Sequence, residues 1–321
     1  MLAACGQPAE ETETETAQDT EREVLVTAAF QGGNGDAAAL AFLPRADAPS
    51  LGAILAAPRQ GGLDLFDADG LRRGELAGPR LSGLAAAPGF QLRGESLPLV
   101  FGTAADGSGL FGYAVLLDEF EAFDLPLANS GSADGISGLC LMEEGIGYVD
   151  LVILNTGATA EVWRVSDNGN EAMSVEALSQ FALPAPARAC TTLDGSIFTL
   201  SPASGIARLD REGNVTAELN VAGADLAAGE FNGTPLIIVT DGATGQLEAF
   251  NASDLMPAAE FTVVDGLSTP GIGQAGAISV TDQTYGFTAY SQGMLAVFDR
   301  SDERVKVISR EAFTRAYFTA E

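Results

Sequence analysis

The sequence predicts an all-β fold, a six-bladed β-propeller, and three observations support this: short apolar runs, little helical periodicity, and a segment that recurs about every 40 to 50 residues. From residue 24 onward, apolar runs of about five residues, such as 51–55 and 236–240, are separated by Gly, Asp, Asn and Pro. Such runs between turn-forming residues are typical of β-strands. Residues 170–178 are ambiguous, and residues 309–317 predict a terminal helical turn.

The recurring segment is an alternating strand that ends in an aromatic or large apolar residue, often followed by Asp or Asn. The six copies end at Phe66, Tyr113, Trp163, Leu209, Phe250 and Phe298, with spacings of 47, 50, 46, 41 and 48 residues. A period of this length in all-β sequence is typical of propeller blades of about four strands each. The copies therefore predict six blades in one domain, with the first strand of each blade lining a central channel.

Closure of such a ring is favoured when the first strand of the chain completes the last blade, because this hides sheet edges. Residues 23–27 (Glu-Val-Leu-Val-Thr) are the candidate for that strand. Turns of the Asp-x-x-Gly type are expected at the outer rim. Residues 67–70 resemble the start of an EF-hand loop, but the twelfth residue of that loop is Gly78 rather than Glu, so a hairpin turn is predicted. Residues 167–170 are interpreted in the same way.

The composition excludes several classes of enzyme and partner. The chain has 321 residues, 44 acidic and 16 basic side chains, a net charge of −28, no histidine, and one lysine, Lys306. Without histidine there is no Ser–His–Asp triad and no histidine zinc site, and no P-loop string occurs. The negative charge excludes nucleic acid as an expected partner; it suits calcium, cationic partners or solubility in salt. The sequence contains no run of about 18 apolar residues, so no membrane-spanning helix is predicted.

The first 23 residues differ from the rest of the chain. Leu2-Ala-Ala-Cys5 is similar to the lipobox of bacterial lipoproteins, in which the cysteine carries the lipid; a chance match in alanine-rich sequence is the alternative. Residues 10–23 hold seven acidic residues and one arginine, which predicts a disordered tether. We therefore expect a lipobox remnant and tether over 1–23 and a propeller over 24–321. The protein is expected to be an exported, monomeric lipoprotein of the periplasm or outer membrane, anchored through Cys5.

Two further cysteines, Cys140 and Cys190, lie in apolar, strand-like segments. An oxidising compartment outside the cytoplasm would allow a disulfide between them. Two buried free thiols are the alternative, because cysteine is among the most buried residue types.

Several strings, taken in order, resemble those of the β-propeller phytases (3-phytases), six-bladed calcium-dependent enzymes that remove phosphate from inositol hexakisphosphate. Residues 62–70 (GLDLFDADG) are similar to that family's GLxVYDLDG, and residues 137–141 (SGLCL) to its YGLCL. Further similar strings are Arg80-Leu81 with Phe90, Glu161-Val-Trp163, Ser204–Asp210 and Ala224-Asp225-Leu226. The resemblance runs from about residue 30 to residue 313 and implies the same propeller fold.

The resemblance is weaker where that family has its chemistry, which places calcium ions on carboxylates and phosphates on basic side chains. Most of those positions hold other residues here: Ala85, Ala87, Ser137, Arg188, Ser201, Pro202, Ala227 and Gly276. The residues that survive are Arg59 and Arg80 as candidate phosphate ligands, and Asp36, Asn155, Asp225 and Asp241 as candidate calcium ligands. For each, a role in a turn or at a blade edge is the alternative. No catalytic residue is predicted.

Three functions are consistent with these observations. The first is a phytase-like propeller with a decayed calcium and phosphate site, acting as an exported binding or accessory module for an inositol phosphate or a protein partner. The second is a calcium-dependent 3-phytase, a phosphoric monoester hydrolase, with a rearranged site. The third is a generic propeller binding protein in which the strings reflect blade architecture alone. A calcium site needs about six to eight oxygen ligands per ion, so the missing carboxylates favour the first.

Overall fold

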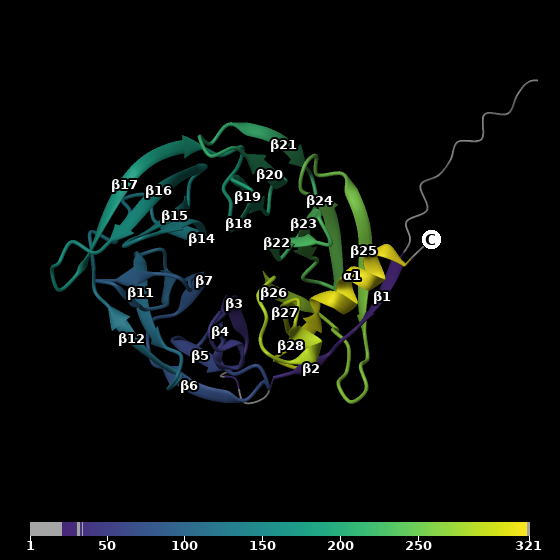
Figure 1. The fold of residues 1–321 in the computed structure, drawn as a ribbon. Helices are drawn as coiled ribbons and strands as arrows, with labels where there is room; N and C mark the ends of the chain where they lie inside the picture. Colours follow the sequence, from purple (N-terminus) through teal and green to yellow (C-terminus); the bar gives the residue numbers. More distant parts are fainter. Residues whose placement is uncertain (1–20, 31–32, 34, 320–321) are drawn as a thin grey trace, which may run out of the picture.

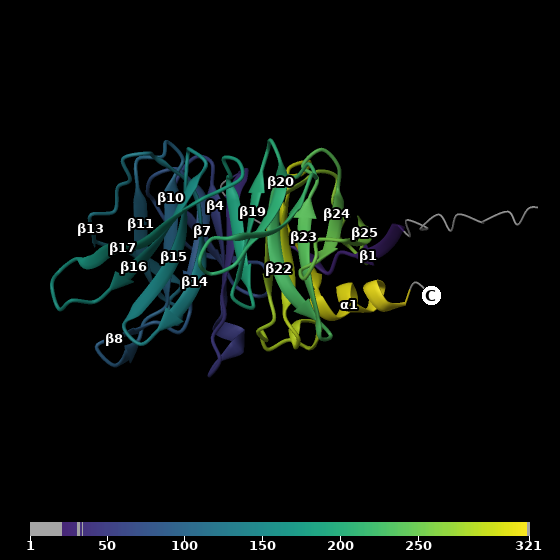
Figure 2. The ribbon, with the colours of Figure 1, turned by 90° about the horizontal axis from the view of Figure 1, so that it is seen from above.

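Six β-sheets stand around a central axis in the computed structural model, which describes residues 21–30, 33 and 35–319 (Figure 1). Seen from the side, the ring forms a short cylinder, and the C-terminal helix lies at its edge (Figure 2). The prediction of a six-bladed β-propeller is confirmed. Within the described ranges, no helix has the length and apolar character needed to cross a membrane.

The innermost strands of the blades, numbered one to six in this order, are β3 (Ala37–Leu43), β7 (Leu81–Ala87), β14 (Ile136–Gly145), β18 (Ala189–Leu193), β22 (Asp225–Phe231) and β26 (Ala275–Thr281). The second strands are β4 (Ala53–Pro58), β10 (Leu99–Ala104), β15 (Tyr148–Asn155), β19 (Ser196–Ser201), β23 (Thr234–Thr240) and β27 (Met294–Asp299). The innermost strands line the central channel, as predicted, and the second strands lie directly outside them.

The third strands are β5 (Leu63–Phe66), β11 (Leu110–Leu116), β16 (Thr159–Ser166), β20 (Gly205–Leu209), β24 (Gln246–Asn251) and β28 (Arg304–Ser309). The fourth strands are β6 (Arg72–Leu76), β12 (Glu121–Leu125), β17 (Met173–Ala182), β21 (Val215–Leu219), β25 (Pro257–Val264) and β2 (Ala28–Ala29). The remaining elements are β1 (Glu21–Leu25), β13 (Leu127–Ala128), the hairpin β8 (Gln91–Leu92) and β9 (Glu95–Ser96), the 3-10 turns η1 (Pro49–Leu51) and η2 (Thr288–Tyr290), and helix α1 (Arg310–Phe318).

Burial decreases from the inside of each blade to the outside. Every residue of β4 and of β10 is buried, because neighbouring blades cover both faces of the middle strands. The outer strands β6 and β21 have no buried residue. Apolar clusters fill the spaces between adjacent blades; one joins Ala85, Leu99 and Trp163 of blades two and three. These stacked interfaces hold the innermost strands in place around the channel.

The ring is closed by the N-terminal segment, although not by the predicted residues alone. β2 pairs with β28 and supplies the outermost strand of blade six, after the 23–27 segment. β1 instead pairs in parallel with β25 as a fifth strand of blade five, with Glu21 opposite Glu260 and Leu25 opposite Val264. The expectation that 23–27 completes the last blade is therefore corrected. β1 also begins inside the segment assigned to the tether; residues 1–20, including Cys5, lie outside the described residues.

The sixth copy of the repeat lies on a different strand from the other five. Phe66, Tyr113, Trp163, Leu209 and Phe250 are on third strands, whereas Phe298 is on β27, a second strand. The third strand of blade six, β28, contains no aromatic residue and no large apolar residue followed by Asp or Asn, so the pattern is matched by β27 instead. The turn after Phe298 therefore lies beside the channel rather than at the outer rim.

Four smaller expectations also have outcomes. The ambiguous residues 170–178 lead into strand β17, and the terminal helical turn is α1. Residues 67–70 form the hairpin turn between β5 and β6, in which Asp67 accepts the N–H groups of Asp69 (3.1 Å) and Leu71 (2.9 Å). Cys140 and Cys190 form a disulfide, which decides between the two alternatives and links the innermost strands of blades three and four.

Candidate functional site: the arginine-lined mouth of the channel

A cavity of about 760 Å³ follows the channel and is lined by residues from all six innermost strands. We call the end at which these strands begin the strand-start mouth, and the other end the strand-end mouth. Because each blade is an antiparallel sheet, the turn between its second and third strands also lies at the strand-start mouth. Two kinds of segment therefore present side chains there: the residues just before an innermost strand, and the turns after a second strand.

Hydrogen bonds connect neighbouring segments at the strand-start mouth; five of the six join two blades, and the one between Ala105 and Arg80 lies within blade two. In ring order these are Gly62 N–H to Pro79 O (2.9 Å), Ala105 N–H to Arg80 O (2.8 Å), Ile136 N–H to Gly107 O (3.0 Å), Ser137 Oγ to Ala187 O (2.8 Å), Arg188 Nη2 to Gly223 O, and Ile278 N–H to Asp225 Oδ2 (3.0 Å). This series of hydrogen bonds places the beginnings of five innermost strands, β7, β14, β18, β22 and β26, at one end of the channel.

Four arginines line this mouth: Arg59, Arg80, Arg188 and Arg300. They come from the turn after β4, the residue before β7, the residue before β18 and the turn after β27. Among the described residues that line the cavity at this end, Asp225 is the one carboxylate. Acidic residues outnumber basic ones by 44 to 16 in the whole chain, so this local excess of positive charge reverses the balance of the molecule.

Asp225 lies between two of the arginines. Its Oδ2 accepts the N–H of Ile278 (3.0 Å), and its Oδ1 accepts the N–H of Leu226 (2.9 Å). Burial of the carboxylate raises the pKa of Asp225 to about 6, although both N–H donors and the charges of Arg188 and Arg300 oppose this rise. The two guanidinium groups, from blades four and six, therefore act on one carboxylate of blade five.

Arg300 is incompletely satisfied by the protein. Its Nε is buried and has no hydrogen-bond partner among the described residues. A Cβ atom on Gly276 would lie 3.0 Å from this nitrogen, so the glycine leaves room for the guanidinium group. A buried N–H without an acceptor is unfavourable, which makes this nitrogen a candidate donor to a ligand.

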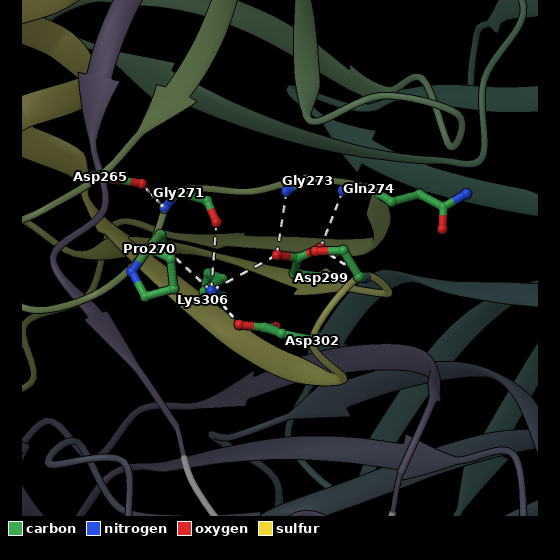
Figure 3. Close-up of polar contacts among 9 residues, drawn as sticks. Asp265, Pro270, Gly271, Gly273, Gln274, Asp299, Asp302 and Lys306 are labelled. Carbon is green, nitrogen blue, oxygen red and sulfur yellow. Dashed lines mark hydrogen bonds and ion pairs between the residues drawn. The ribbon is translucent and has the colours of Figure 1, made fainter.

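A buried lysine stabilises the strand that leads into the Arg300 turn (Figure 3). The Nζ of Lys306 lies near Pro270 O (3.0 Å), Gly271 O (3.4 Å), Asp302 Oδ2 (2.6 Å) and Asp299 Oδ2 (3.7 Å). Asp299, directly before Arg300, also accepts the N–H groups of Gly273 (3.2 Å) and Gln274 (3.0 Å). This cluster joins the loop between blades five and six to the end of β27.

Arg59 and Arg80 occupy the opposite side of the same mouth. The guanidinium group of Arg59 forms an ion pair with Asp36, and its backbone N–H donates to the backbone oxygen of Asp36 (2.7 Å). The side chain of Arg80 is exposed and makes no hydrogen bond or ion pair with a described residue. Arg80 is therefore available to a ligand without breaking an interaction of the protein.

The strand-end mouth has the opposite charge. Its cavity lining includes Asp194, Glu230 and Asp282, together with Arg310. Arg310 is engaged locally: its guanidinium lies 5.3 Å from the ring centroid of Phe231 and donates to Gln292 O (2.8 Å). The channel thus runs from a basic mouth to a mainly acidic one.

The structure brings four of the predicted site residues together and leaves two apart. Asp36, Arg59, Arg80 and Asp225 lie at the strand-start mouth. Asn155 is at the same end but one strand further out, where it is fully buried and its amide donates to Thr159 (3.1 Å) and Glu161 (3.2 Å). The other outlying residue, Asp241, accepts the N–H of Thr244 (3.0 Å) within its own turn and does not line the cavity.

The calcium site that the resemblance implies is not compatible with the residues at this mouth. Among the described residues, no group of three or more Asp, Glu, His or Cys side chains could hold a metal ion. Of the candidate ligands there, Asp36 is paired with Arg59, and Asp225 is bonded to two backbone N–H groups. Calcium requires about six to eight oxygens, and four guanidinium groups would repel it.

Sequence reasoning missed Arg188 and Arg300 as candidate ligands. Arg188 is at a position where the resemblance implies an acidic calcium ligand, and it was interpreted only as the loss of that ligand. Arg300 lies two residues after Phe298, the closing residue of the sixth copy of the repeat, and it was not considered as a ligand. The available signal was that each arginine lies directly before or after a strand. Such a residue reaches the strand-start mouth only before a first strand or after a second strand, so the signal requires knowing the order of the strands in the blade.

Comparisons with known proteins support the fold and do not identify a family. No protein-family model matches the chain, and no curated protein matches its sequence. Among solved structures, the Cps50 (Swd1) β-propeller domain of Myceliophteria thermophila has a TM-score of 0.55 at 8% identity over 89% of this chain and 99% of that one. The WD40 β-propeller domain of Doa1 has a TM-score of 0.51 at 13% identity over 91% of this chain and 99% of that one. At these identities the likeness concerns the propeller fold alone.

Proposed function

We propose that this chain is a phytase-like propeller that binds its ligand at the strand-start mouth without hydrolysing it, as an exported binding or accessory module. The observation that carries the proposal is the lining of that mouth, where arginines stand in place of clustered carboxylates. Catalysis on calcium needs a coordination shell that the described residues do not supply. The export role rests on the Leu-Ala-Ala-Cys5 sequence, and the ligand is a small molecule or a protein partner.

The test is release of inorganic phosphate from inositol hexakisphosphate, measured with calcium and with a chelator. We expect no release above the protein-free blank in either condition. An active calcium-dependent phytase, assayed in parallel, shows that the substrate and conditions are competent. Phosphate release that requires calcium and stops with chelator would show that the protein is an enzyme and that the proposal is wrong.

The alternative function is a calcium-dependent 3-phytase with a rearranged site, and Asp225 is the observation that favours it. A partly buried carboxylate with a pKa of about 6 beside a cavity has the properties of an acid–base residue. If the wild-type protein releases phosphate, assays of Asp225→Asn and Asp241→Asn show whether Asp225 acts in the reaction. Loss of activity in the first variant alone would support the enzyme.

A further inference from the structure

We infer that the strand-start mouth binds a small organic or inorganic polyanion directly through guanidinium groups, with no divalent cation between them. The inference rests on the proposed function, because it names the ligand class of the same site. It concerns Arg59, Arg80, Arg188 and Arg300, which line the mouth from separate blades or blade junctions. The ligand class is a compact molecule with two or more phosphate or carboxylate groups.

The charge of the mouth is the first argument. Four arginines and the carboxylate of Asp225 line it among the described residues, and Asp36 pairs with Arg59 beside it, in a chain whose net charge is −28. Guanidinium groups in a recess, partly shielded from water, bind oxyanions with charge-assisted and often bidentate hydrogen bonds. The acidic outer surface would repel an anion that approached elsewhere, so a polyanion is favoured only at this mouth.

The unsatisfied donors are the second argument, and they are independent of the charge. The buried Nε of Arg300 has no acceptor among the described residues, and the side chain of Arg80 has no described partner. A folded protein normally pairs a buried N–H group, so an acceptor from outside the chain is the simplest partner for Arg300. Arg80 and Arg300 lie in different blades, so a ligand with two or more anionic groups can pair with both at once.

The way in which two of the arginines, Arg188 and Arg300, are held is the third argument. Arg188 donates to Gly223 O, while the disulfide between Cys140 and Cys190 lies two residues further along its strand. Arg300 follows Asp299, which belongs to the Lys306 cluster (Figure 3). Anchored backbones reduce the conformational entropy that these side chains lose when a ligand binds. The mouth is therefore organised before the ligand arrives.

The experiment is titration calorimetry of the full chain in EDTA, with tripolyphosphate as the phosphate probe and citrate as the carboxylate probe. We expect binding of at least one probe, with affinity that falls as salt is raised. Arg80→Gln and Arg300→Gln should each weaken binding by about tenfold, as expected for a lost charge-assisted hydrogen bond. The control is Arg315→Gln, which removes the same charge from the exposed face of α1, outside the cavity lining. Tighter binding of one probe identifies the preferred oxyanion.

Three results would overturn the inference. These are no binding of either probe in EDTA, binding that appears only when calcium is added, and an Arg315→Gln variant that loses as much affinity as Arg80→Gln. Arg80 is exposed and unpaired with described residues, so its variant should fold even if Arg300→Gln does not. Phosphate release from the probe would contradict the proposed function and leave the binding inference intact. Absence of binding would contradict the inference alone.

Discussion

Asp225 shows how a single residue couples the site to stability. Its pKa is about 6 in the folded protein, against 3.8 for an ordinary aspartate, mainly because the carboxylate is buried. Between these two values the folded state holds a proton that the unfolded state has lost. The free energy of unfolding therefore falls as the pH rises through this window. The full free-energy cost of burying the ionised carboxylate is reached above about pH 6.

Asp225→Asn should remove this cost. We expect the variant to gain stability relative to wild type as the pH is raised from 4 to 7, by about 2 kcal/mol after allowance for partial exposure. Urea unfolding of both proteins at several pH values measures the difference. Asp106→Asn is a control of opposite sign: hydrogen bonds from Ser108 lower the pKa of Asp106, so its contribution is lost as the pH falls. A difference between Asp225→Asn and wild type that is the same at every pH would contradict the prediction.

Residue by residue, the sequence predicted part of the candidate site. Asp225, Arg59 and Arg80 were identified because short strings around them resemble a family with a known site. Asn155 and Asp241 were identified in the same way, yet the Asn155 side chain bonds to Ser132, Thr159 and Glu161, and that of Asp241 bonds to Thr244 in its own turn. Whether a polar side chain points into the channel or into its own turn depends on local hydrogen bonds, and a string of residues does not reveal these.

The loop between β25 and β26 shows how one element is positioned by one side chain. Lys306 on β28 is fully buried, and its ammonium group contacts two carbonyl oxygens of this loop and two carboxylates of blade six. Burial opposes ionisation of Asp299, but hydrogen bonds from Ser301, Gln274 and Gly273 outweigh it and hold the pKa of Asp299 below its usual value. The Asp299 carboxylate is therefore charged in the interior, with the ammonium group of Lys306 3.7 Å away.

Lys306→Met should be strongly destabilising, because it leaves Asp299 buried and charged without its cation. The expected loss is about 3–5 kcal/mol in the free energy of unfolding, which urea denaturation measures. Arg304→Met is the matched control: it is on the same strand but exposed, and we expect a change within about 0.5 kcal/mol. Hydrogen exchange of residues 266–274 should also increase in Lys306→Met. Unchanged exchange there would show that the lysine does not hold the loop.

Among the elements, strands that are buried on one or both faces were predicted well, because their apolar patterns are dictated by the stacking of blades. β17 was ambiguous, since its outer half is exposed and carries mixed residues. The sixth copy was grouped with the other five because Phe298 is apolar and followed by Asp like the other closing residues, yet it occupies a second strand rather than a third. Local pattern identifies a strand, but its order within a blade is set by contacts with distant parts of the chain.

At the scale of the whole molecule, the two ends of the chain meet at blades five and six. β1 extends blade five, β2 completes blade six, and α1 packs beside β1 at the edge of the ring (Figure 1). Phe261 and Phe313 pack with ring centroids 4.2 Å apart, which joins the helix to blade five. No local pattern could have shown that the N-terminal strands divide between two blades, because both partners lie more than 200 residues away.

This closure predicts where the ring opens first. Thr27 lies between β1 and β2; its N–H donates to Val307 O (2.8 Å), and its hydroxyl accepts the N–H of Ser309 (2.9 Å). Thr27→Pro removes both interactions and leaves two buried backbone groups without partners, which should cost about 2–5 kcal/mol. Thr27→Ser keeps the N–H and the hydroxyl and should stay close to wild type. Hydrogen exchange should rise first in β28 of Thr27→Pro, before the blades opposite. If exchange rises equally in all six blades, the N-terminal segment stabilises the ring only as a whole, and closure at blade six is not its weakest point.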